Sequence, residues 1–332
     1  MSATEELTAR LRGTVLPAVL TPMDTAGSVD LPALRRYAER IAAERVGGVA
    51  VWAHTGRGLC LAPADRRHVM TVWRDVLDVP VVAGAGVPRS ERAATQPAAE
   101  DATVAMAVEA AGLGADAVMV YPMARYGGLP DGVERAVALH ERVAAESGLP
   151  VLGFFLHAGA GGYPYPPELV RRLLALPSTA GIKIATLDRA VDCQDAVRAA
   201  QGSGRLVVTG EDRMFGPSLM WGADTALVGI AAARVGLTTA VLDAWTAGDA
   251  GAFLRASDRL DRFAEVTFLA PIEGYVRRMM WAAVWEGIIP EEAAHDPYGP
   301  PLPEAERHAV VACLEELATA GEGAAADEGA TV

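Results

Sequence analysis

A single lysine, Lys183, stands among the 29 basic residues of this 332-residue chain, and the other 28 are arginines. A coding bias towards arginine accounts for the scarcity of lysine but leaves the retained one unexplained. Arginine stays protonated in proteins, so it is neither a neutral nucleophile nor a former of imines. The composition therefore indicates a task at Lys183 that arginine does not perform, and imine formation with a carbonyl compound is such a task.

Lys183 lies within a short apolar run, Gly-Ile-Lys-Ile-Ala at 181–185, which has the pattern of a buried strand. Burial disfavours the charged form of an amine and lowers its pKa, so this lysine is expected to be partly neutral near pH 7. A neutral amine attacks a carbonyl carbon, and the resulting imine is an electron sink for C–C cleavage, C–C formation or dehydration. The alternative is structural, with the ammonium group at the rim of the fold, paired with a carboxylate.

The elements around this lysine follow a regular alternation of eight apolar runs and seven stretches of helical periodicity. The apolar runs lie at 15–20, 48–53, 79–84, 115–121, 150–156, 180–185, 205–210 and 224–230. The helical stretches lie at 31–45, 63–77, 98–112, 131–147, 167–176, 188–200 and 213–221. This pattern predicts an α/β protein, a (β/α)8 TIM barrel over residues 12–235. An open doubly wound sheet is less suitable, because no G-x-G-x-x-G motif follows a run.

Beyond the eighth run the periodicity is helical, at 237–246, 249–266, 272–285 and 303–317. We interpret these stretches as the eighth barrel helix and a C-terminal helical extension, residues 236–318, that packs on the barrel. Residues 319–332 are rich in Ala, Gly and Glu and are predicted to form a disordered tail.

Active sites of such barrels form at the C-terminal ends of the strands. That rule predicts a set of residues at the barrel mouth near Lys183. They are His54, Thr55, Gly56 and Arg57 after the second strand, Arg125 and Tyr126 after the fourth, Phe154 and His157 at the fifth, Glu211 and Asp212 after the seventh, and Gly229 and Ile230 at the eighth.

Several short motifs occur in a characteristic order. They are Pro-Ala-Val-Leu-Thr-Pro-Met at 17–23, His-Thr-Gly-Arg-Gly at 54–58, Gly-Ala-Asp-Ala-Val at 114–118, Gly-Ile-Lys-Ile-Ala at 181–185 and Thr-Gly-Glu-Asp at 209–212. Over roughly residues 12–318 the chain thereby resembles the dihydrodipicolinate synthase / N-acetylneuraminate lyase family of class I (Schiff-base) lyases. The resemblance implies a TIM barrel that needs no cofactor, assembly as a homodimer or homotetramer, and an imine-forming role for Lys183.

The chain departs from the family pattern at the barrel mouth. The usual Gly-Thr-Thr-Gly-Glu motif, which holds the carboxylate of a 2-oxo acid, reads Ala-His-Thr-Gly-Arg at 53–57. The family's proton-relay tyrosine on strand 5 aligns with Phe154, and the arginine that often follows this strand aligns with Gly159. The family's tyrosine after strand 4 aligns near Arg125, one residue from Tyr126. These differences argue against dihydrodipicolinate synthase itself and leave the proton relay open.

We therefore expect a lyase in which Lys183 forms the imine and His54, His157 or Tyr126 moves protons. The guanidinium group of Arg57 or Arg125 is suited to bind the carboxylate of a substrate. The alternative for each is a solvent-exposed loop arginine with no role in binding. For His54 and His157 the alternative to a catalytic role is a structural one, in which the ring lines the mouth and forms a hydrogen bond to the backbone. The expected substrate-binding residues are Thr55, Gly56, Arg57, Arg125, Phe154, Asp212, Gly229 and Ile230.

The leading hypothesis is an aldolase-type lyase acting on a 2-oxo acid or a related small carbonyl compound. An imine-dependent dehydratase or hydratase-aldolase on a sugar acid or aryl-pyruvate is the first alternative, and a catalytically degenerate binding or regulatory barrel is the second. A formal charge of −13 argues against nucleic acid and anionic membrane surfaces as partners. Three dispersed cysteines and an acidic N-terminus without an apolar leader favour a cytoplasmic protein, and no metal-ligand spacing occurs.

Overall fold

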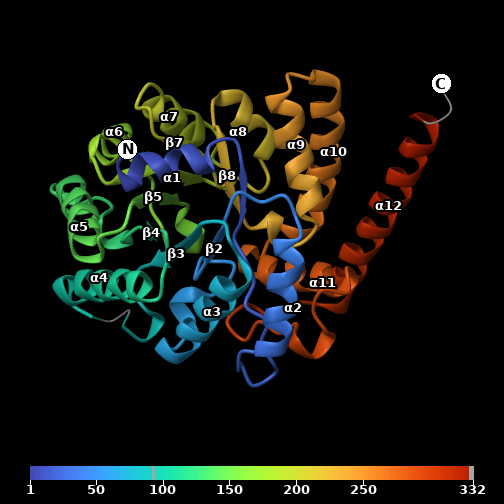
Figure 1. Ribbon diagram of the computed structural model, residues 1–332, viewed down its shortest axis with the longest axis horizontal. Coiled ribbons are helices and arrows are strands. Elements are labelled where there is room, and N and C mark those ends of the chain that lie inside the picture. Colours follow the sequence, from blue (N-terminus) through green and yellow to red (C-terminus); the bar gives the residue numbers. More distant parts are fainter. Residues whose placement is uncertain (92–93, 329–332) are drawn as a thin grey trace.

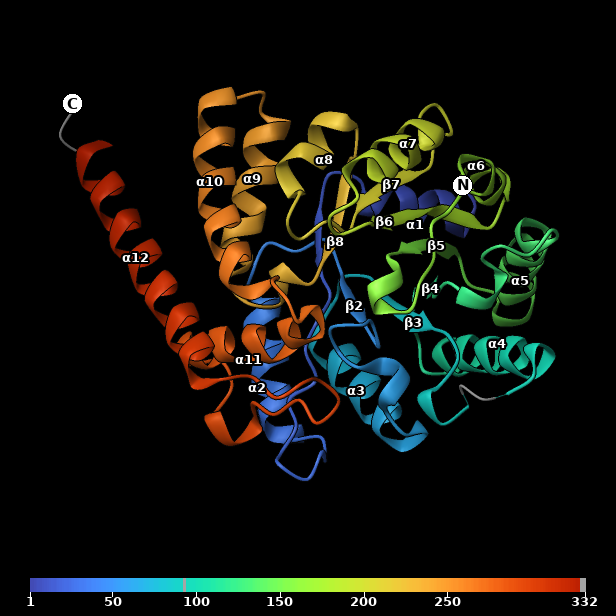
Figure 2. The same cartoon turned by 180° about the vertical axis from the view of Figure 1, so that it is seen from behind.

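Eight parallel strands form the centre of the computed structural model, which describes residues 1–91 and 94–328, with side chains as far as Thr319. The strands are β1 (Val15–Pro17), β2 (Val49–Val51), β3 (Val81–Ala85), β4 (Ala117–Val120), β5 (Val151–Leu156), β6 (Thr179–Ala185), β7 (Leu206–Thr209) and β8 (Thr225–Val228). β1 pairs with β8, and a parallel bridge between Ala18 and Ala50 brings β1 beside β2. The sheet therefore closes into the predicted barrel (Figures 1 and 2).

The barrel helices lie outside the strands, as the helical periodicity predicts (Figure 1). They are α2 (Leu31–Ala42), α3 (Pro63–Val76), α4 (Gln96–Gly112), α5 (Gly132–Ser147), α6 (Pro167–Ala175), α7 (Ala190–Ala200), α8 (Phe215–Trp221) and α9 (Val235–Thr246). Asp30 accepts a hydrogen bond from the Ala33 N–H at the start of α2, and prolines occupy the first turns of α3 and α6. These are ordinary start signals for helices.

Alternate strand residues serve two different apolar layers, because successive side chains of a strand point to opposite faces. Outward residues such as Val118 and Ile182 pack under the helices. Inward residues fill the barrel, and this inner layer contains Leu16, Ala18, Ala50, Val82, Met119, Leu152, Phe154, Leu206, Val208 and Leu227. A lysine at an inward position is therefore held inside the barrel by its strand register.

A short helix that the sequence analysis did not predict, α1 (Ala3–Leu11), precedes the first strand. Ser2 and Glu5 form a capping box at its start. Leu7 and Leu11 pack into the inner layer, and the Thr8 hydroxyl donates to the Ala180 carbonyl at 3.4 Å. α1 thus covers the barrel end at which the strands begin and leaves the opposite end for the site.

The C-terminal extension contains α10 (Ala250–Thr267), α11 (Tyr275–Trp285) and α12 (Glu304–Glu328). α10 packs against α9, and α12 contacts α10 and α11 before running outward along one side of the molecule (Figures 1 and 2). α12 enters the segment 319–332, for which disorder is predicted, and residues 329–332 lie outside the described part of the chain. The division into 12–235, 236–318 and a disordered tail stays a prediction.

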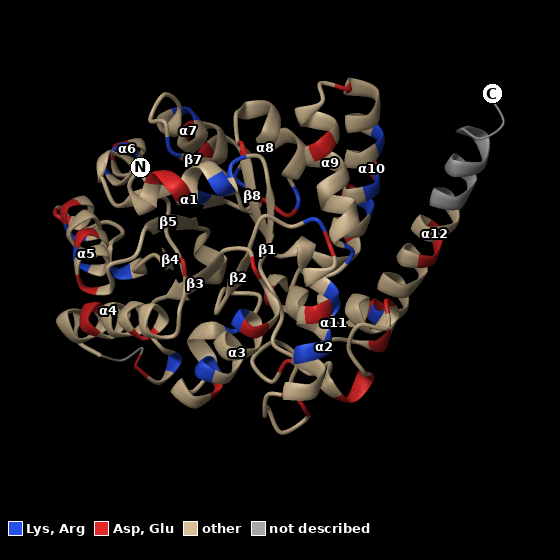
Figure 3. Ribbon diagram, viewed as in Figure 1, with Lys and Arg blue, Asp and Glu red and all other residues tan. Residues whose placement is uncertain are grey.

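Charged residues gather on the helices and loops that surround the barrel (Figure 3). None of the helices in the described part of the chain combines the length and the apolar character that a membrane span requires.

Candidate active site

Lys183 lies inside the barrel, as its strand pattern predicts. In the sheet it pairs with Phe154 on β5 and Val208 on β7, and only 6% of its surface is exposed. Its Nζ lies 4.5 Å from the centre of the Phe154 ring. Gly210 makes room for the side chain, because a Cβ at position 210 would lie 2.5 Å from the lysine Cε.

The surroundings of Lys183 increase the neutral fraction of its amine. Burial lowers the pKa of Lys183 from 10.5 to about 8, and the charges of Asp212 and Glu211 oppose the shift only in part. No ion pair within 4.0 Å joins Lys183 to a carboxylate among the described residues, so the rim-paired structural alternative does not apply. The amine instead lines a small cavity at the barrel mouth, together with Thr55 and His157.

Two carboxyl groups follow β7 and differ in their partners. Glu211 accepts hydrogen bonds from the Thr186 N–H and hydroxyl, at 2.6 and 2.8 Å, and from the Leu187 N–H at 3.1 Å. Asp212 lines the cavity, and its Oδ1 accepts from the Ile230 N–H at 2.7 Å. Burial raises the pKa of Asp212 despite that hydrogen bond and the charge of Lys183. Asp212 and Lys183 thus line the same cavity, and the charge of each opposes the effect of burial on the pKa of the other.

A tyrosine hydroxyl from the C-terminal extension reaches the same cavity. Tyr275, the first residue of α11, has its Oη 3.0 Å from the Thr55 Oγ1 and 3.0 Å from the His54 Nδ1. The Phe268 ring stacks on the Tyr275 ring, with 4.7 Å between centroids, and fixes the phenol from the other side. Burial raises the pKa of Tyr275, so its hydroxyl is protonated at neutral pH.

Glu273 and Arg57 extend this network. The His54 Nε2 lies 3.0 Å from one oxygen of Glu273, and Arg57 donates to the other at 2.5 Å. Arg57 also donates to both oxygens of Asp296, at 3.1 and 2.6 Å. Although burial favours the neutral acid, His54 and Arg57 lower the pKa of Glu273 to about 2. Glu273 is therefore a carboxylate at every ordinary pH.

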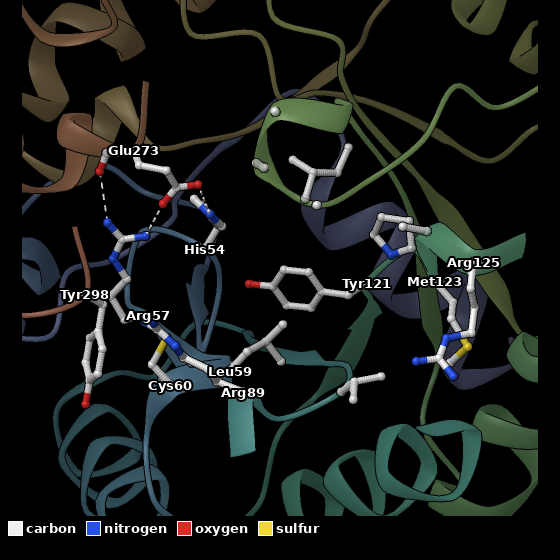
Figure 4. Close-up of a pocket in the computed structure, with 18 residues that line it drawn as sticks. His54, Arg57, Leu59, Cys60, Arg89, Tyr121, Met123, Arg125, Glu273 and Tyr298 are labelled. Atoms are coloured by element: carbon white, nitrogen blue, oxygen red, sulfur yellow. Dashed lines mark hydrogen bonds and ion pairs between the residues drawn. The ribbon is translucent and has the colours of Figure 1, made fainter. Parts of the chain in front are cut away.

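A larger cavity of about 580 Å³ opens beside the Lys183 cavity, and the two share His54, Leu156, Ala160 and Glu273. Tyr121 is one of the residues that line it, and Figure 4 shows this ring between His54 and Glu273 on one side and Arg125 with Met123 on the other. The Tyr121 hydroxyl donates to the Trp52 carbonyl at 3.2 Å. The remaining lining mixes apolar with basic groups, including Leu59, Cys60, Val87, Arg89 and Tyr298.

Most of the predicted site residues come together at the mouth. Those that line the Lys183 cavity are His54, Thr55, Phe154, His157, Asp212 and Gly229. Arg57 lines the larger cavity, but its nitrogens bond to Glu273 and Asp296, so contact with a substrate carboxylate stays a prediction. Ile230 is fully buried and contributes its N–H to Asp212.

Three predicted residues lie away from Lys183. The Tyr126 hydroxyl donates to Glu100 on α4 at 2.7 Å, and the ring packs in the outer layer, so the structure does not bring Tyr126 to the lysine. The Gly56 carbonyl accepts from the Thr21 hydroxyl, and the residue lines neither cavity. Arg125 lies at the far side of the larger cavity, where it donates to the Ala94 carbonyl.

The sequence analysis missed Tyr275, Glu273 and Gly210. Residues 272–285 show helical spacing with several Met and Trp residues, which indicates packing and gives no sign of a polar group aimed at the barrel. Gly210 carries no local signal beyond its place after β7. Burial lowers the pKa of His157, which lines the cavity as predicted. Within the described residues, no group of three or more His, Cys, Asp or Glu residues is arranged to hold a metal ion.

The sequence profile of the dihydrodipicolinate synthetase family matches residues 11–317. The 4-hydroxy-tetrahydrodipicolinate synthase of Bifidobacterium longum is 28% identical over 279 residues, which cover 84% of this chain and 86% of the relative. The 4-hydroxy-tetrahydrodipicolinate synthase 1 of Streptomyces coelicolor is 29% identical over 267 residues, covering 80% and 81% of the two chains.

Solved structures with the same fold include two from bacteria. A prophage protein of the dihydrodipicolinic acid synthase family from E. coli K12, in complex with pyruvate, aligns with a TM-score of 0.78 at 21% identity, covering 92% of this chain and 98% of that one. The sialic acid aldolase of Ruminococcus gnavus aligns with a TM-score of 0.79 at 18% identity, covering 95% and 99% of the chains. At these identities the likeness concerns the fold.

Proposed function

This chain belongs to the dihydrodipicolinate synthetase family, and we propose that it is a class I lyase in which Lys183 forms an imine with a 2-oxo acid or related carbonyl compound. One observation carries the proposal: the only lysine of the chain is buried at an inward strand position, beside a cavity, with its pKa lowered to about 8. The relatives named as synthases and the aldolase with the same fold support it.

The imine step follows from the groups around Lys183. The lone pair of the neutral amine bonds to the carbonyl carbon, the C=O π pair moves to the oxygen, and one proton passes from nitrogen to that oxygen. The nitrogen lone pair then expels the hydroxyl group, which takes one further proton and leaves as water. A protonated Asp212 carboxyl is suited to supply that proton, because burial raises its pKa. The cationic imine is then left beside the Asp212 carboxylate.

The two cavities divide the substrate between them. The small cavity at Lys183 suits the 2-oxo acid portion, which the Thr55 hydroxyl and neighbouring backbone N–H groups would orient. The adjoining cavity of about 580 Å³ suits the remainder of the molecule that is joined or released. Its Tyr121, Leu59 and Val87 offer apolar contact, and Arg89 and Arg125 offer positive charge. A dehydratase or hydratase-aldolase reaction uses the same imine, and analysis of the product masses distinguishes it from simple aldol chemistry.

Borohydride trapping tests the proposed function. The protein is incubated with pyruvate, 2-oxobutyrate or phenylpyruvate, reduced, and weighed intact. We expect the mass to increase by that of the acid less one oxygen atom, at a position that digestion assigns to Lys183. Lys183→Arg, which keeps the charge, and Lys183→Met, which keeps an apolar stem, should show no side-chain adduct. Lack of an adduct in the wild type with every acid, or an unchanged adduct in both variants, would contradict the proposal.

A further inference from the structure

The cavity around Lys183 needs a group that moves protons to and from carbon, and the Phe154 ring has no proton to give. Among the described residues that line this cavity, the hydroxyl groups are those of Thr55 and Tyr275. They are hydrogen-bonded to each other at 3.0 Å, and only Tyr275 also touches a titratable side chain, His54. The tyrosine therefore joins a hydroxyl group in the cavity to the His54 ring, which lines the same cavity.

The hydrogen-bond directions in this network follow from Glu273. Its carboxylate only accepts, so the neutral His54 ring carries its proton on Nε2 and donates it to Glu273 at 3.0 Å. The Nδ1 is then an acceptor, and the Tyr275 hydroxyl donates to it at 3.0 Å. A carboxylate that orients a histidine, which accepts a proton from a hydroxyl, is the arrangement that activates hydroxyl groups in catalytic triads.

The surrounding residues hold this arrangement in place. Arg57 bonds to Glu273 and Asp296 and is itself buried, so the Glu273 carboxylate is fixed on its far side. Gly229 permits the close approach of the phenol, because a Cβ at that position would lie 3.1 Å from the Tyr275 ring and 3.1 Å from the Thr55 hydroxyl. The Tyr275 ring therefore packs between the Gly229 backbone and the Phe268 ring, at the Lys183 cavity. Figure 4 shows the His54 and Glu273 side chains joined to each other.

We propose that Tyr275, His54 and Glu273 form a proton-transfer triad for the carbon next to the imine. The inference rests on the proposed function. As the C3–H bond breaks, Tyr275 passes its own proton to the His54 Nδ1 and its oxygen receives the C3 proton. The C–H electron pair becomes the enamine C=C bond, and the imine π pair returns to nitrogen. The proton held on His54 goes back through Tyr275 to the oxygen of the carbonyl partner when a C–C bond forms.

Exchange of the methyl protons of pyruvate in D2O tests the triad, because exchange requires removal of a C3 proton but no second substrate. NMR follows the exchange, and borohydride trapping measures the imine in the same samples. We expect Tyr275→Phe to slow exchange at least about 100-fold while the trapped adduct stays within a few-fold of wild type. Tyr163→Phe is the matched control, since its ring packs against Tyr165 in the outer layer, and its exchange should match wild type.

A second variant, His54→Ala, distinguishes the loss of a proton-transfer group from a change in the shape of the cavity. His54 lines the larger cavity, so small molecules reach its place. We expect His54→Ala to slow exchange and added imidazole to restore part of the rate, at an unchanged adduct level. Glu273→Gln should shift the pH profile of exchange, because the histidine loses its orienting charge.

Each outcome has one interpretation. Normal exchange in Tyr275→Phe with a normal adduct overturns the triad and leaves the proposed function intact. Loss of the adduct in Tyr275→Phe makes the hydroxyl a structural group and also overturns the triad. Wild-type protein that shows neither an adduct nor exchange of the C3 protons with pyruvate, 2-oxobutyrate or phenylpyruvate contradicts the proposed function, and the triad with it.

Discussion

At the scale of the residue, the chemistry depends on how far burial outweighs nearby charge at Lys183. Desolvation of the ammonium lowers the pKa, and the two carboxyl groups after β7 oppose it. Glu211 lies within a cluster of hydrogen-bond donors from Thr186 and Leu187, so part of its charge is already balanced. Desolvation therefore prevails, and a larger fraction of the amine is neutral at pH 7 than in an exposed lysine.

The rate of imine formation should follow the neutral fraction of Lys183. With a pKa of about 8, roughly a tenth of the amine is neutral at pH 7, against about one part in three thousand at the ordinary pKa. We expect the initial rate of trapping to rise about tenfold per pH unit below pH 7 and to level off above about pH 8.5. Stopped-flow trapping at several pH values measures this, and a rate that still rises in proportion at pH 10 would contradict the shifted pKa.

Gly210 should be intolerant of even one methyl group. A Cβ there would lie 2.5 Å from the Lys183 Cε and 2.9 Å from the Ile184 carbonyl oxygen, so the lysine has to move. We expect Gly210→Ala to lower the trapping rate at least about tenfold and to cost about 1–3 kcal/mol of unfolding free energy. Gly236→Ala is the control, because its Cβ meets nothing within 4 Å and alanine favours a helix. Equal trapping rates for the two variants would contradict the role of Gly210 in making room for Lys183.

The residue types could be predicted from the sequence, but their partners could not. Lys183 is identified by its singularity and Thr55 by its place after a strand, and both line the cavity. Tyr126 is a candidate because it follows strand 4, one residue from the position of the family's tyrosine, yet local sequence does not say which way a side chain leaves its loop. Tyr275 reaches the mouth only through packing between distant parts of the chain.

At the scale of the element, the loop between α10 and α11 carries Glu273 to the barrel, and the start of α11 carries Tyr275 there. Arg278 on α11 is fully buried and donates to the carbonyls of Thr267, Leu269 and Pro271, and to Glu306 on α12 at 2.7 Å. The Pro271 carbonyl also accepts from the Gly274 N–H at 2.9 Å, whereas Arg278 is the donor to the other two. One arginine thereby links the C-terminal helices to the shape of the site.

Removal of the Arg278 side chain should damage both stability and chemistry. Arg278→Met removes the donor that Glu306 and the carbonyls of Thr267 and Leu269 share, and we expect a loss of about 3 kcal/mol in unfolding free energy, with slower pyruvate exchange. Arg262→Met removes an exposed pair between α10 and α12 and should cost at most about 1 kcal/mol. Urea denaturation compares them, and equal losses would contradict the role of Arg278 in the loop.

The elements themselves were largely predictable, because a buried parallel strand and an amphipathic helix have distinct periods. The eight strands and the barrel helices lie within or close to the predicted ranges, although β1 and β2 are only three residues long. α1 was missed, since nine residues with an exposed acidic face give a weak pattern. Its burial depends on the barrel end that it covers, which a local pattern does not contain.

At the scale of the whole molecule, packing closes one end of the barrel and the candidate site occupies the other end. α1 closes the end where the strands begin, and the C-terminal extension supplies residues to the end where they finish. The apolar inner layer between these ends leaves little of the Lys183 surface exposed to water. The cytoplasmic location expected from composition stays a prediction.

The resemblance to the family predicts a homodimer or homotetramer. Light scattering of the purified protein should give at least twice the 34.6 kDa of one chain. A single species at the mass of one chain, at micromolar concentration, would contradict that expectation without affecting the chemistry at Lys183.

The most direct test of the central claim is a crystal structure of the protein soaked with pyruvate. The account predicts continuous electron density from the Lys183 Nζ to C2 of the acid, with the carboxylate near Thr55 and the methyl carbon facing the Tyr275 hydroxyl. Pyruvate bound in the cavity with no bond to Lys183, or bound only elsewhere while the cavity holds water, would contradict it.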